Sequence, residues 1–289
     1  MRSFIAAVVT AAVTARKVPT AVFHGLGDQC VNPGMHDFAR EIQQKTGAYA
    51  HCVEVGNGAE TSIFGNFAHQ AQMACDAVLA NPNFQGEFNV VGLSQGSLLG
   101  RYIVESCPIP GKVRNYLSIG GPQMGVSDVP HCFGDNEMCN SINFVARNLA
   151  YYPIVQDILG PTGYFRDPRH MDLYLEYSEF LPYVNNELGT AEAMASNKAR
   201  FSSLHGLMAV LFTEDTMVYP KESEWFQQLE ASDMVTVQPL EDSQFYAEDL
   251  IGLRTLNEAG AVQFVSIVGD HLQFSQSDID NTFIPFLLS

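Results

Sequence analysis

The stretch from Glu87 to Gly100 constrains the fold of this chain more than any other part of its sequence. Phe88–Val91 is a short apolar run, as expected of a buried central strand. Gly92-Leu-Ser-Gln-Gly96 follows directly, and Ser97–Val104 has the composition of an apolar helix. A strand, a G-x-S-x-G turn and a helix form the context of a nucleophile elbow, in which a sharp turn exposes the serine at the carboxyl end of a sheet. The sequence therefore marks Ser94 as a candidate nucleophile.

Strand and helix candidates alternate on both sides of this elbow. Val18–Phe23 and Val113–Ile119 are strand candidates in the first half of the chain, and Leu207–Thr213 and Ala261–Val268 are strand candidates in the second. Alternating strands and helices predict a mostly parallel, doubly wound α/β sheet. With the elbow at its centre, the pattern favours the α/β-hydrolase fold. The alternative is a glycine-rich turn in which Ser94 only caps the helix that follows.

The pattern changes between residues 126 and 203, where aromatic residues and short helix candidates replace the alternation. We therefore predict a hydrolase core made of residues 16–125 and 204–289, with residues 126–203 inserted as a cap over the carboxyl ends of the strands. Because this insertion holds the largest apolar reserve outside the core elements, we expect it to bind lipid. The alternative is a helical extension whose aromatic residues simply pack against the sheet.

Residues 151–159 of the insertion form the predicted acyl-binding element. They place Tyr151, Val155 and Ile158 at helical spacing on one face, with Leu159 beside them. A fatty chain needs such a surface, because each CH₂ group removed from water contributes about 0.8 kcal/mol. The same face could instead dock the insertion onto the sheet.

The charge balance of the chain bears on its partners, whereas its N-terminus and its cysteines bear on its cellular compartment. The chain has 15 Lys and Arg against 32 Asp and Glu, a formal charge of −17, so nucleic acid is not an expected partner. Residues 1–15 have the layout of a secretory signal peptide, and no other stretch approaches the about 20 apolar residues of a membrane span. Six cysteines suit an oxidising compartment and suggest three disulfides. Six free thiols in a cytosolic chain are the alternative.

A serine hydroxyl is a weak nucleophile and needs a base within hydrogen-bond reach. His271 follows the last predicted strand, and Asp215 follows the preceding one, where an acid would orient the imidazole. Ser94, Asp215 and His271 also stand in the chain order of α/β-hydrolase triads. Glu214 competes with Asp215 but would face the other way if the strand geometry continues, and Asp270 is expected to lie in a turn.

The segment His24-Gly-Leu-Gly follows the first strand, where hydrolases of this fold place the loop that completes the oxyanion hole. The backbone N–H groups of Leu26 and Gln95 are the predicted donors, and His24 is expected to order the loop. The chain has no C-x-x-C and no H-E-x-x-H motif, so we predict neither a metal site nor a cofactor.

Motifs spread along the whole chain resemble one family. They are Gly92-Leu-Ser-Gln-Gly96, His24-Gly-Leu-Gly-Asp28, Tyr164-Phe-Arg-Asp-Pro168, Ser223-Glu-Trp-Phe226, Glu248-Asp-Leu-Ile-Gly-Leu253, Gly269-Asp-His-Leu-Gln273 and Ile284-Pro-Phe-Leu. From about residue 18 to the C-terminus, the sequence is similar to the palmitoyl-protein thioesterase family.

This resemblance implies a serine hydrolase that cleaves long-chain fatty acyl thioesters from cysteines of proteins or peptides, in the lysosome. It places the nucleophile, acid and base on Ser94, Asp215 and His271. It also implies disulfides between Cys75 and Cys107 and between Cys132 and Cys139, which leaves Cys30 and Cys52 without an assigned partner. The alternatives are a secreted carboxylester lipase or acyltransferase with the same triad, or a lipid-binding protein of this fold without turnover.

The sequence departs from the family pattern in two places. Gly120-Gly-Pro-Gln-Met-Gly125 stands where the family usually has Gly-Gly-Gln-His-Gln-Gly, so no side-chain role is transferred to that loop. The chain also has no Asn-x-Ser/Thr sequon, so sorting to lysosomes through a glycan is not assumed. A secreted fate therefore remains open beside the lysosomal one.

Overall fold

The computed structural model describes residues 17–128, 144–145 and 148–289. The predicted signal peptide and the predicted Cys132–Cys139 disulfide lie outside the described residues. The centre of the molecule is a sheet of parallel strands in the order β2-β1-β3-β4-β5-β8. Its strands are β1 (Thr20–Phe23), β2 (Ala50–Cys52), β3 (Glu87–Leu93), β4 (Lys112–Ile119), β5 (Gly206–Phe212) and β8 (Val262–Ile267).

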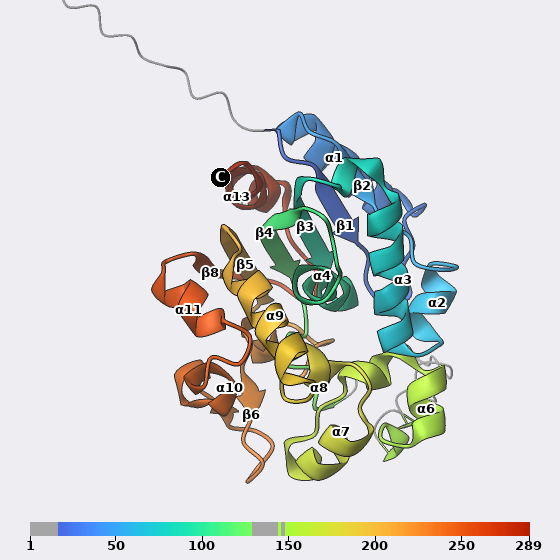
Figure 1. Cartoon of the computed structure of the whole chain (residues 1–289), viewed down its shortest axis with the longest axis vertical. Helices are drawn as coiled ribbons and strands as arrows, with labels where there is room; N and C mark the ends of the chain where they lie inside the picture. Colours follow the sequence, from blue (N-terminus) through green and yellow to red (C-terminus); the bar gives the residue numbers. More distant parts are fainter. Residues whose placement is uncertain (1–16, 129–143, 146–147) are drawn as a thin grey trace, which may run out of the picture.

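Helices cover both faces of this sheet (Figure 1). One face packs against α1 (Pro33–Thr46) and α13 (Ile284–Leu288), and the other packs against α3 (Phe67–Ala80), α4 (Gln95–Glu105) and α9 (Ala191–Ser202). Successive side chains of a strand point to opposite faces, and both faces are apolar here because both are covered. In β5, for example, Leu207 and Ala209 join one core cluster, while Met208 and Val210 join the other. The predicted doubly wound α/β-hydrolase fold is confirmed.

Apolar residues recur at helical spacing from Ser62 to Leu79, which predicts one long helix, but the structure divides this stretch. α2 (Ala59–Ile63) ends before a short break, and α3 begins after Asn66, whose side chain caps the helix by accepting the N–H of His69. Gly65 in the break has φ +105°, a conformation that suits glycine. The break holds the end of α2 against the active-site loops, as described below.

The chain between β4 and β5 forms short helices gathered at the lower end of the sheet (Figure 1). They are α6 (Pro153–Ile158), η2 (Gly160–Tyr164), η3 (Pro168–His170), α7 (Met171–Tyr177) and α8 (Leu181–Val184), followed by α9. The fully buried Arg101 of α4 ties this segment to the core, because its guanidinium donates to the carbonyl oxygens of Gln123 and Val184 while pairing with Glu105.

Of the remaining described elements, η1 (Pro82–Phe84) precedes β3, and the others connect β5 to β8 or close the chain. These others are η4 (Lys221–Trp225), β6 (Gln228–Leu229), β7 (Val237–Gln238), η5 (Leu240–Asp242), α10 (Gln244–Ala247), α11 (Leu253–Glu258), α12 (Gln276–Asp278) and η6 (Ile279–Phe283). β6 and β7 pair as a separate antiparallel ribbon. None of the described helices has the length and apolarity needed to cross a membrane.

Two disulfides link the first part of the core. One joins Cys75 of α3 to Cys107 just after α4, as the family resemblance implied. The other joins Cys30 to Cys52, the two cysteines whose pairing the sequence left open. Disulfides persist in oxidising compartments, so both bonds agree with a secretory route.

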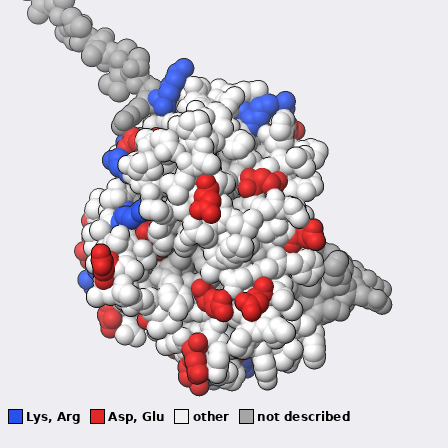
Figure 2. Space-filling model, turned by 45° about the vertical axis from the view of Figure 1, so that its right-hand side comes forward, with Lys and Arg blue, Asp and Glu red and all other residues white. Residues whose placement is uncertain are grey.

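Acidic side chains are scattered over the surface. On the face shown in Figure 2, Asp and Glu spread across the middle and lower parts, whereas the few Lys and Arg lie toward the upper and left edges. The predominance of acidic side chains on this face agrees with the formal charge of −17. No continuous basic patch appears on that face (Figure 2).

Candidate active site

The turn after β3 has the backbone geometry of a nucleophile elbow. Ser94 has φ +52° and ψ −127°, a backbone conformation that residues with a Cβ atom rarely adopt. A Cβ atom on Gly96 would lie 2.4 Å from the carbonyl oxygens of Phe23 and His24, and one on Gly92 would lie 2.5 Å from the backbone nitrogen of Ser97. Both motif glycines are therefore required by close backbone contacts, and the turn they allow leaves the Ser94 side chain partly exposed.

The structure brings the three predicted triad residues together. Nε2 of His271 lies 2.8 Å from Oγ of Ser94, and Nδ1 of His271 lies 2.5 Å from Oδ2 of Asp215. Oδ1 of Asp215 accepts the backbone N–H groups of Met217 and Val218 at 2.7 and 2.8 Å. These bonds fix the carboxylate, so that it can hold the imidazole in the tautomer with Nε2 free to accept the serine proton.

The sequence competitors of these residues lie elsewhere. Glu214 is exposed. Asp270 accepts the N–H groups of His271 and Thr216, so it shapes the loop around the histidine from behind. His24 is buried, and its Nε2 lies 2.8 Å from a carboxylate oxygen of Glu54, away from the serine hydroxyl.

Electrostatics favour an ionised acid in the triad. Burial raises the pKa of Asp215, but the hydrogen bond with His271 and the positive charge of a protonated His271 outweigh it, so the pKa lies below its ordinary value. An ionised Asp215 stabilises the imidazolium that forms when the histidine takes a proton.

The loop that carries Leu26 and the start of α4 at Gln95 both adjoin Ser94. A Cβ atom on Gly25 would lie 3.1 Å from Cβ of Ser94, so the loop that carries Leu26 runs directly beside the nucleophile. Gln95 is the first residue of α4, and the N–H of a first helical residue has no partner within its helix. Such a free N–H beside the serine can donate to a developing oxyanion.

A hydrogen-bond network that the sequence did not reveal joins these two donors. Oγ of Ser62, at the end of α2, accepts the N–H of Gly27, the residue after Leu26. The Gln95 side chain donates to the carbonyl oxygen of Ser62 and accepts the hydroxyl of Tyr164. The end of α2 therefore contacts both the loop that carries Leu26 and the start of α4. The sequence does not indicate these contacts of Ser62 and Tyr164, because Gln95, their shared partner, lies 33 and 69 residues away from them in the chain.

Two clusters of potential metal ligands occur among the described residues. One is His24, Cys30 and Glu54, but the Cys30 sulfur is bonded to Cys52. The other is Asp215, Glu224 and His271, in which two members belong to the triad. His271 is hydrogen-bonded to both Asp215 and Ser94, which is the arrangement of a serine hydrolase.

The predicted acyl-binding residues do not share one helical face, so that part of the prediction is wrong. α6 begins at Pro153, which leaves Tyr151 outside the helix. Val155 and Leu159 are buried in the core, with 5% and 4% exposure, whereas Ile158 is 55% exposed. Because α6 begins at Pro153 and has only 6 residues, its buried positions differ from those that regular helical spacing from Tyr151 predicted.

Comparisons with known proteins agree with this chemistry. Residues 19–271 match the family model for palmitoyl protein thioesterase. Palmitoyl-protein thioesterase 1 of Caenorhabditis elegans is 34% identical over 275 residues, which cover 93% of this chain and 91% of that protein. Palmitoyl-protein thioesterase 3 of Dictyostelium discoideum is 31% identical over 255 residues, covering 88% and 84% of the two chains.

Among solved structures, the 2-hydroxy-6-oxo-6-phenylhexa-2,4-dienoate hydrolase of Rhodococcus sp. strain RHA1 aligns with a TM-score of 0.47 at 14% identity, covering 94% of this chain and 91% of that one. The family model and the two relatives each extend over most of the chain, and the range of the family model includes Ser94, Asp215 and His271. This chain belongs to the palmitoyl protein thioesterase family.

Proposed function

We propose that this protein hydrolyses long-chain fatty acyl thioesters on cysteines of proteins or peptides through an acyl-enzyme on Ser94. The observation that carries the proposal is the continuous hydrogen-bond chain from Ser94 through His271 to Asp215, in a chain of this family. Such a chain activates a hydroxyl that would otherwise be a poor nucleophile.

The geometry of the three side chains supports the following reaction. The Ser94 hydroxyl attacks the thioester carbonyl while Nε2 of His271 takes its proton, and the Leu26 and Gln95 N–H groups stabilise the oxyanion. The substrate sulfur then leaves readily, because the pKa of a cysteine thiol is about 8.5. It takes the proton from His271 as it departs, so the histidine is again free to act as a base. In the second half, His271 removes a proton from water, the hydroxide attacks the ester, and the proton returns to Ser94 as the fatty acid departs.

A matched pair of substrates tests this function. We expect turnover of an S-palmitoyl cysteine peptide, with the O-palmitoyl serine peptide of the same sequence hydrolysed at least tenfold more slowly in kcat/KM. Preference for the oxoester would instead identify a carboxylester lipase, and palmitate binding without turnover of either peptide would identify a lipid-binding protein.

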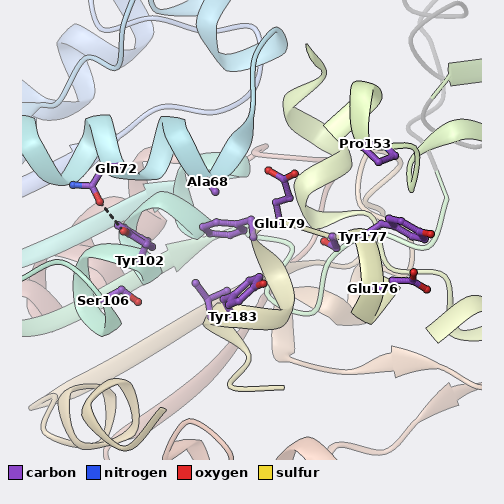
Figure 3. Close-up of a pocket in the computed structure, with 12 residues that line it drawn as sticks. Ala68, Gln72, Tyr102, Ser106, Pro153, Glu176, Tyr177, Glu179 and Tyr183 are labelled. Atoms are coloured by element: carbon purple, nitrogen blue, oxygen red, sulfur yellow. Dashed lines mark hydrogen bonds between the residues drawn. The ribbon is translucent and has the colours of Figure 1, made fainter. Parts of the chain in front are cut away.

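For the fatty chain, we propose a site between the insertion and the core helices. A cavity of about 640 Å³ lies there, within the about 300–1,000 Å³ typical of ligand pockets. Figure 3 shows Tyr177, Tyr183 and Pro153 on the insertion side and Ala68 and Tyr102 on α3 and α4. Phe180 of the insertion also lines the cavity. None of the four residues predicted from the sequence lines this cavity.

The Ala68→Trp variant tests this location, because Ala68 is the smallest side chain in the wall of the cavity (Figure 3). We expect kcat/KM for a C16 thioester to fall at least tenfold while a C4 thioester is hydrolysed within twofold of the wild-type rate. Ala80→Trp, at the exposed end of the same helix, is the matched control. An unchanged chain-length profile in Ala68→Trp places the fatty chain elsewhere, without affecting the assignment of the reaction.

For the compartment, we propose a lysosomal or secreted location. Proteins named lysosomal thioesterase, from Drosophila melanogaster and Mus musculus, are among the relatives, at 32% and 28% identity over parts of the chain. Co-localisation of the tagged full-length chain with a lysosomal marker, compared with its recovery from the medium, distinguishes the two fates.

A further inference from the structure

Glu224 is a buried acidic residue directly behind the triad, and the reaction described above does not use it. It belongs to η4, and its side chain is fully buried. Oε2 of Glu224 accepts the backbone N–H of Phe212, the last residue of β5, at 2.8 Å. An oxygen of the same carboxyl group lies within 4.8 Å of an oxygen of Asp215 and a ring nitrogen of His271.

The other oxygen of Glu224 lacks a donor. Oε1 is buried and accepts no hydrogen bond from any residue in the described part of the chain. The nearby carboxylate of Asp215, with an oxygen within 4.8 Å of an oxygen of Glu224, offers no donor, because an ionised carboxylate can only accept. Two ionised carboxyl groups in contact and out of water repel each other strongly, so one of the pair must carry a proton.

The hydrogen bonds decide which one carries it. Asp215 already has three donors, the N–H groups of Met217 and Val218 and the imidazole of His271, and each favours its ionised form. Glu224 has only the N–H of Phe212. Burial, together with the charge of Asp215, raises the pKa of Glu224 to about 11.

We propose that Glu224 is a positioning residue of the triad: its protonated carboxyl group donates a hydrogen bond to Asp215 and holds that residue ionised and aimed at His271. The role rests on the proposed function, since Glu224 acts through Asp215 and never touches the substrate. An ionised Glu224 would place a second buried negative charge beside His271 and alter the electrostatic potential at the imidazole. The proton on Glu224 keeps its carboxyl group neutral and so prevents this.

Two substitutions of similar volume separate this role from packing. Glu224→Gln keeps a donor for Asp215 and an acceptor for Phe212, whereas Glu224→Met fills the space with neither. We expect Glu224→Gln to keep at least a third of the wild-type kcat on an S-palmitoyl peptide. Glu224→Met should lose at least 30-fold in kcat with KM within twofold, and the acidic limb of its kcat/KM profile should move to higher pH, because Asp215 then bears its charge without this donor. Glu222→Gln, on the same turn, is the control.

Equal kcat losses in the Gln and Met variants, or an unshifted pH profile in Glu224→Met, would overturn the proposal and leave Glu224 a packing residue. The rate at which a fluorophosphonate labels Ser94 provides a second readout. It must follow the same order, wild type, Gln, then Met, and it reports on the triad whatever the natural substrate is. If the fluorophosphonate labels Ser94 of the wild type but no thioester is hydrolysed, the proposed function is wrong and the role proposed for Glu224 is not affected.

Proton release on unfolding tests the protonated state without any activity. The titratable groups that face Glu224 are Asp215 and His271, with Glu222 on its own turn. A glutamic acid that is protonated when folded and ionised when unfolded makes stability fall as pH rises from about 4.5 toward its raised folded pKa. Between pH 6 and 9, wild type should therefore release one proton more than Glu224→Gln on unfolding in denaturant. Equal proton release by the two proteins means that Glu224 is ionised when folded, and the proposal is then wrong.

Discussion

At the scale of single residues, the backbone of Ser94 explains how the nucleophile is presented. Its φ of +52° costs roughly 1–3 kcal/mol for a residue with a Cβ atom. The surrounding contacts hold this conformation, with the Ser94 N–H bonded to the carbonyl oxygen of Ile119 at 2.8 Å. The protein thus maintains local strain at the point where the hydroxyl meets the substrate.

This strain predicts a difference between two inactive variants. Ser94→Ala and Ser94→Gly both remove the hydroxyl, and each should lower kcat by about 10⁴-fold or more. Only glycine relieves the positive φ, so Ser94→Gly should exceed Ser94→Ala in unfolding free energy by about 1 kcal/mol, measured by urea denaturation. Ser203→Ala, at an exposed position after α9, is the control for activity. Equal stability of the two Ser94 variants would show that the turn is not strained.

The sequence could indicate that Ser94, Asp215 and His271 meet, because each follows a strand of the sheet and the three stand in a fixed chain order. Asp215 and His271 lie in the loops after β5 and β8, which are neighbours in the sheet. Ser62 and Glu224 could not be predicted, because their roles depend on contacts between segments that only the folded chain brings together. A serine at a helix end and a glutamate in a short turn look ordinary in a sequence.

At the scale of elements, the end of α2 acts as a support for the oxyanion site. Gly160 of the insertion also lies there, since a Cβ atom on it would be 2.9 Å from the carbonyl oxygen of Ser62. One short helix therefore contacts the loop after β1, the start of α4 and the insertion. The sequence predicted the strands well, but it missed this helix boundary, because apolar spacing continues through the break between Ile63 and Phe67.

Removing the Ser62 hydroxyl should loosen this support. In Ser62→Ala the N–H of Gly27 loses its acceptor, and the adjoining Leu26 donor loses its fixed position. A misplaced oxyanion donor lowers kcat by up to 10²–10³-fold, and we expect about tenfold here because the donor itself remains. Steady-state kinetics on an S-palmitoyl peptide check this, with KM within twofold of wild type.

Glu60→Ala, on the same helix and exposed, should keep wild-type kinetics. If Ser62→Ala does so as well, the network is structural and does not position the donor.

At the scale of the whole molecule, the disulfides and the buried ion pair hold the core and the insertion in one unit. The bond between Cys75 and Cys107 joins α3 to the end of α4, and both cysteines are fully buried. The buried ion pair of Arg101 and Glu105 lies in α4. The Arg101 guanidinium also donates to the carbonyl oxygen of Val184, which belongs to the insertion. The sequence predicted the first disulfide only through the family resemblance, since cysteine positions alone allow many pairings.

Loss of this bond should lower stability measurably. The bond closes a loop of 32 residues, for which the chain-entropy model gives roughly 3–4 kcal/mol. The double variant Cys75→Ala and Cys107→Ala should lose about that much unfolding free energy in denaturant titrations without reductant, since alanine adds no buried polar group. A loss below about 1 kcal/mol would mean that the unfolded state gains little freedom from removal of the link.

The central claim is that Ser94 carries the fatty acyl group during turnover, and acid quenching tests it most directly. The enzyme is mixed with an S-palmitoyl peptide, quenched in acid within the first turnovers, and mapped by mass spectrometry after proteolysis. The account predicts a palmitoyl ester on Ser94 in wild type and none in Ser94→Ala. Palmitate on another side chain, or continued thioester hydrolysis by Ser94→Ala, would contradict it.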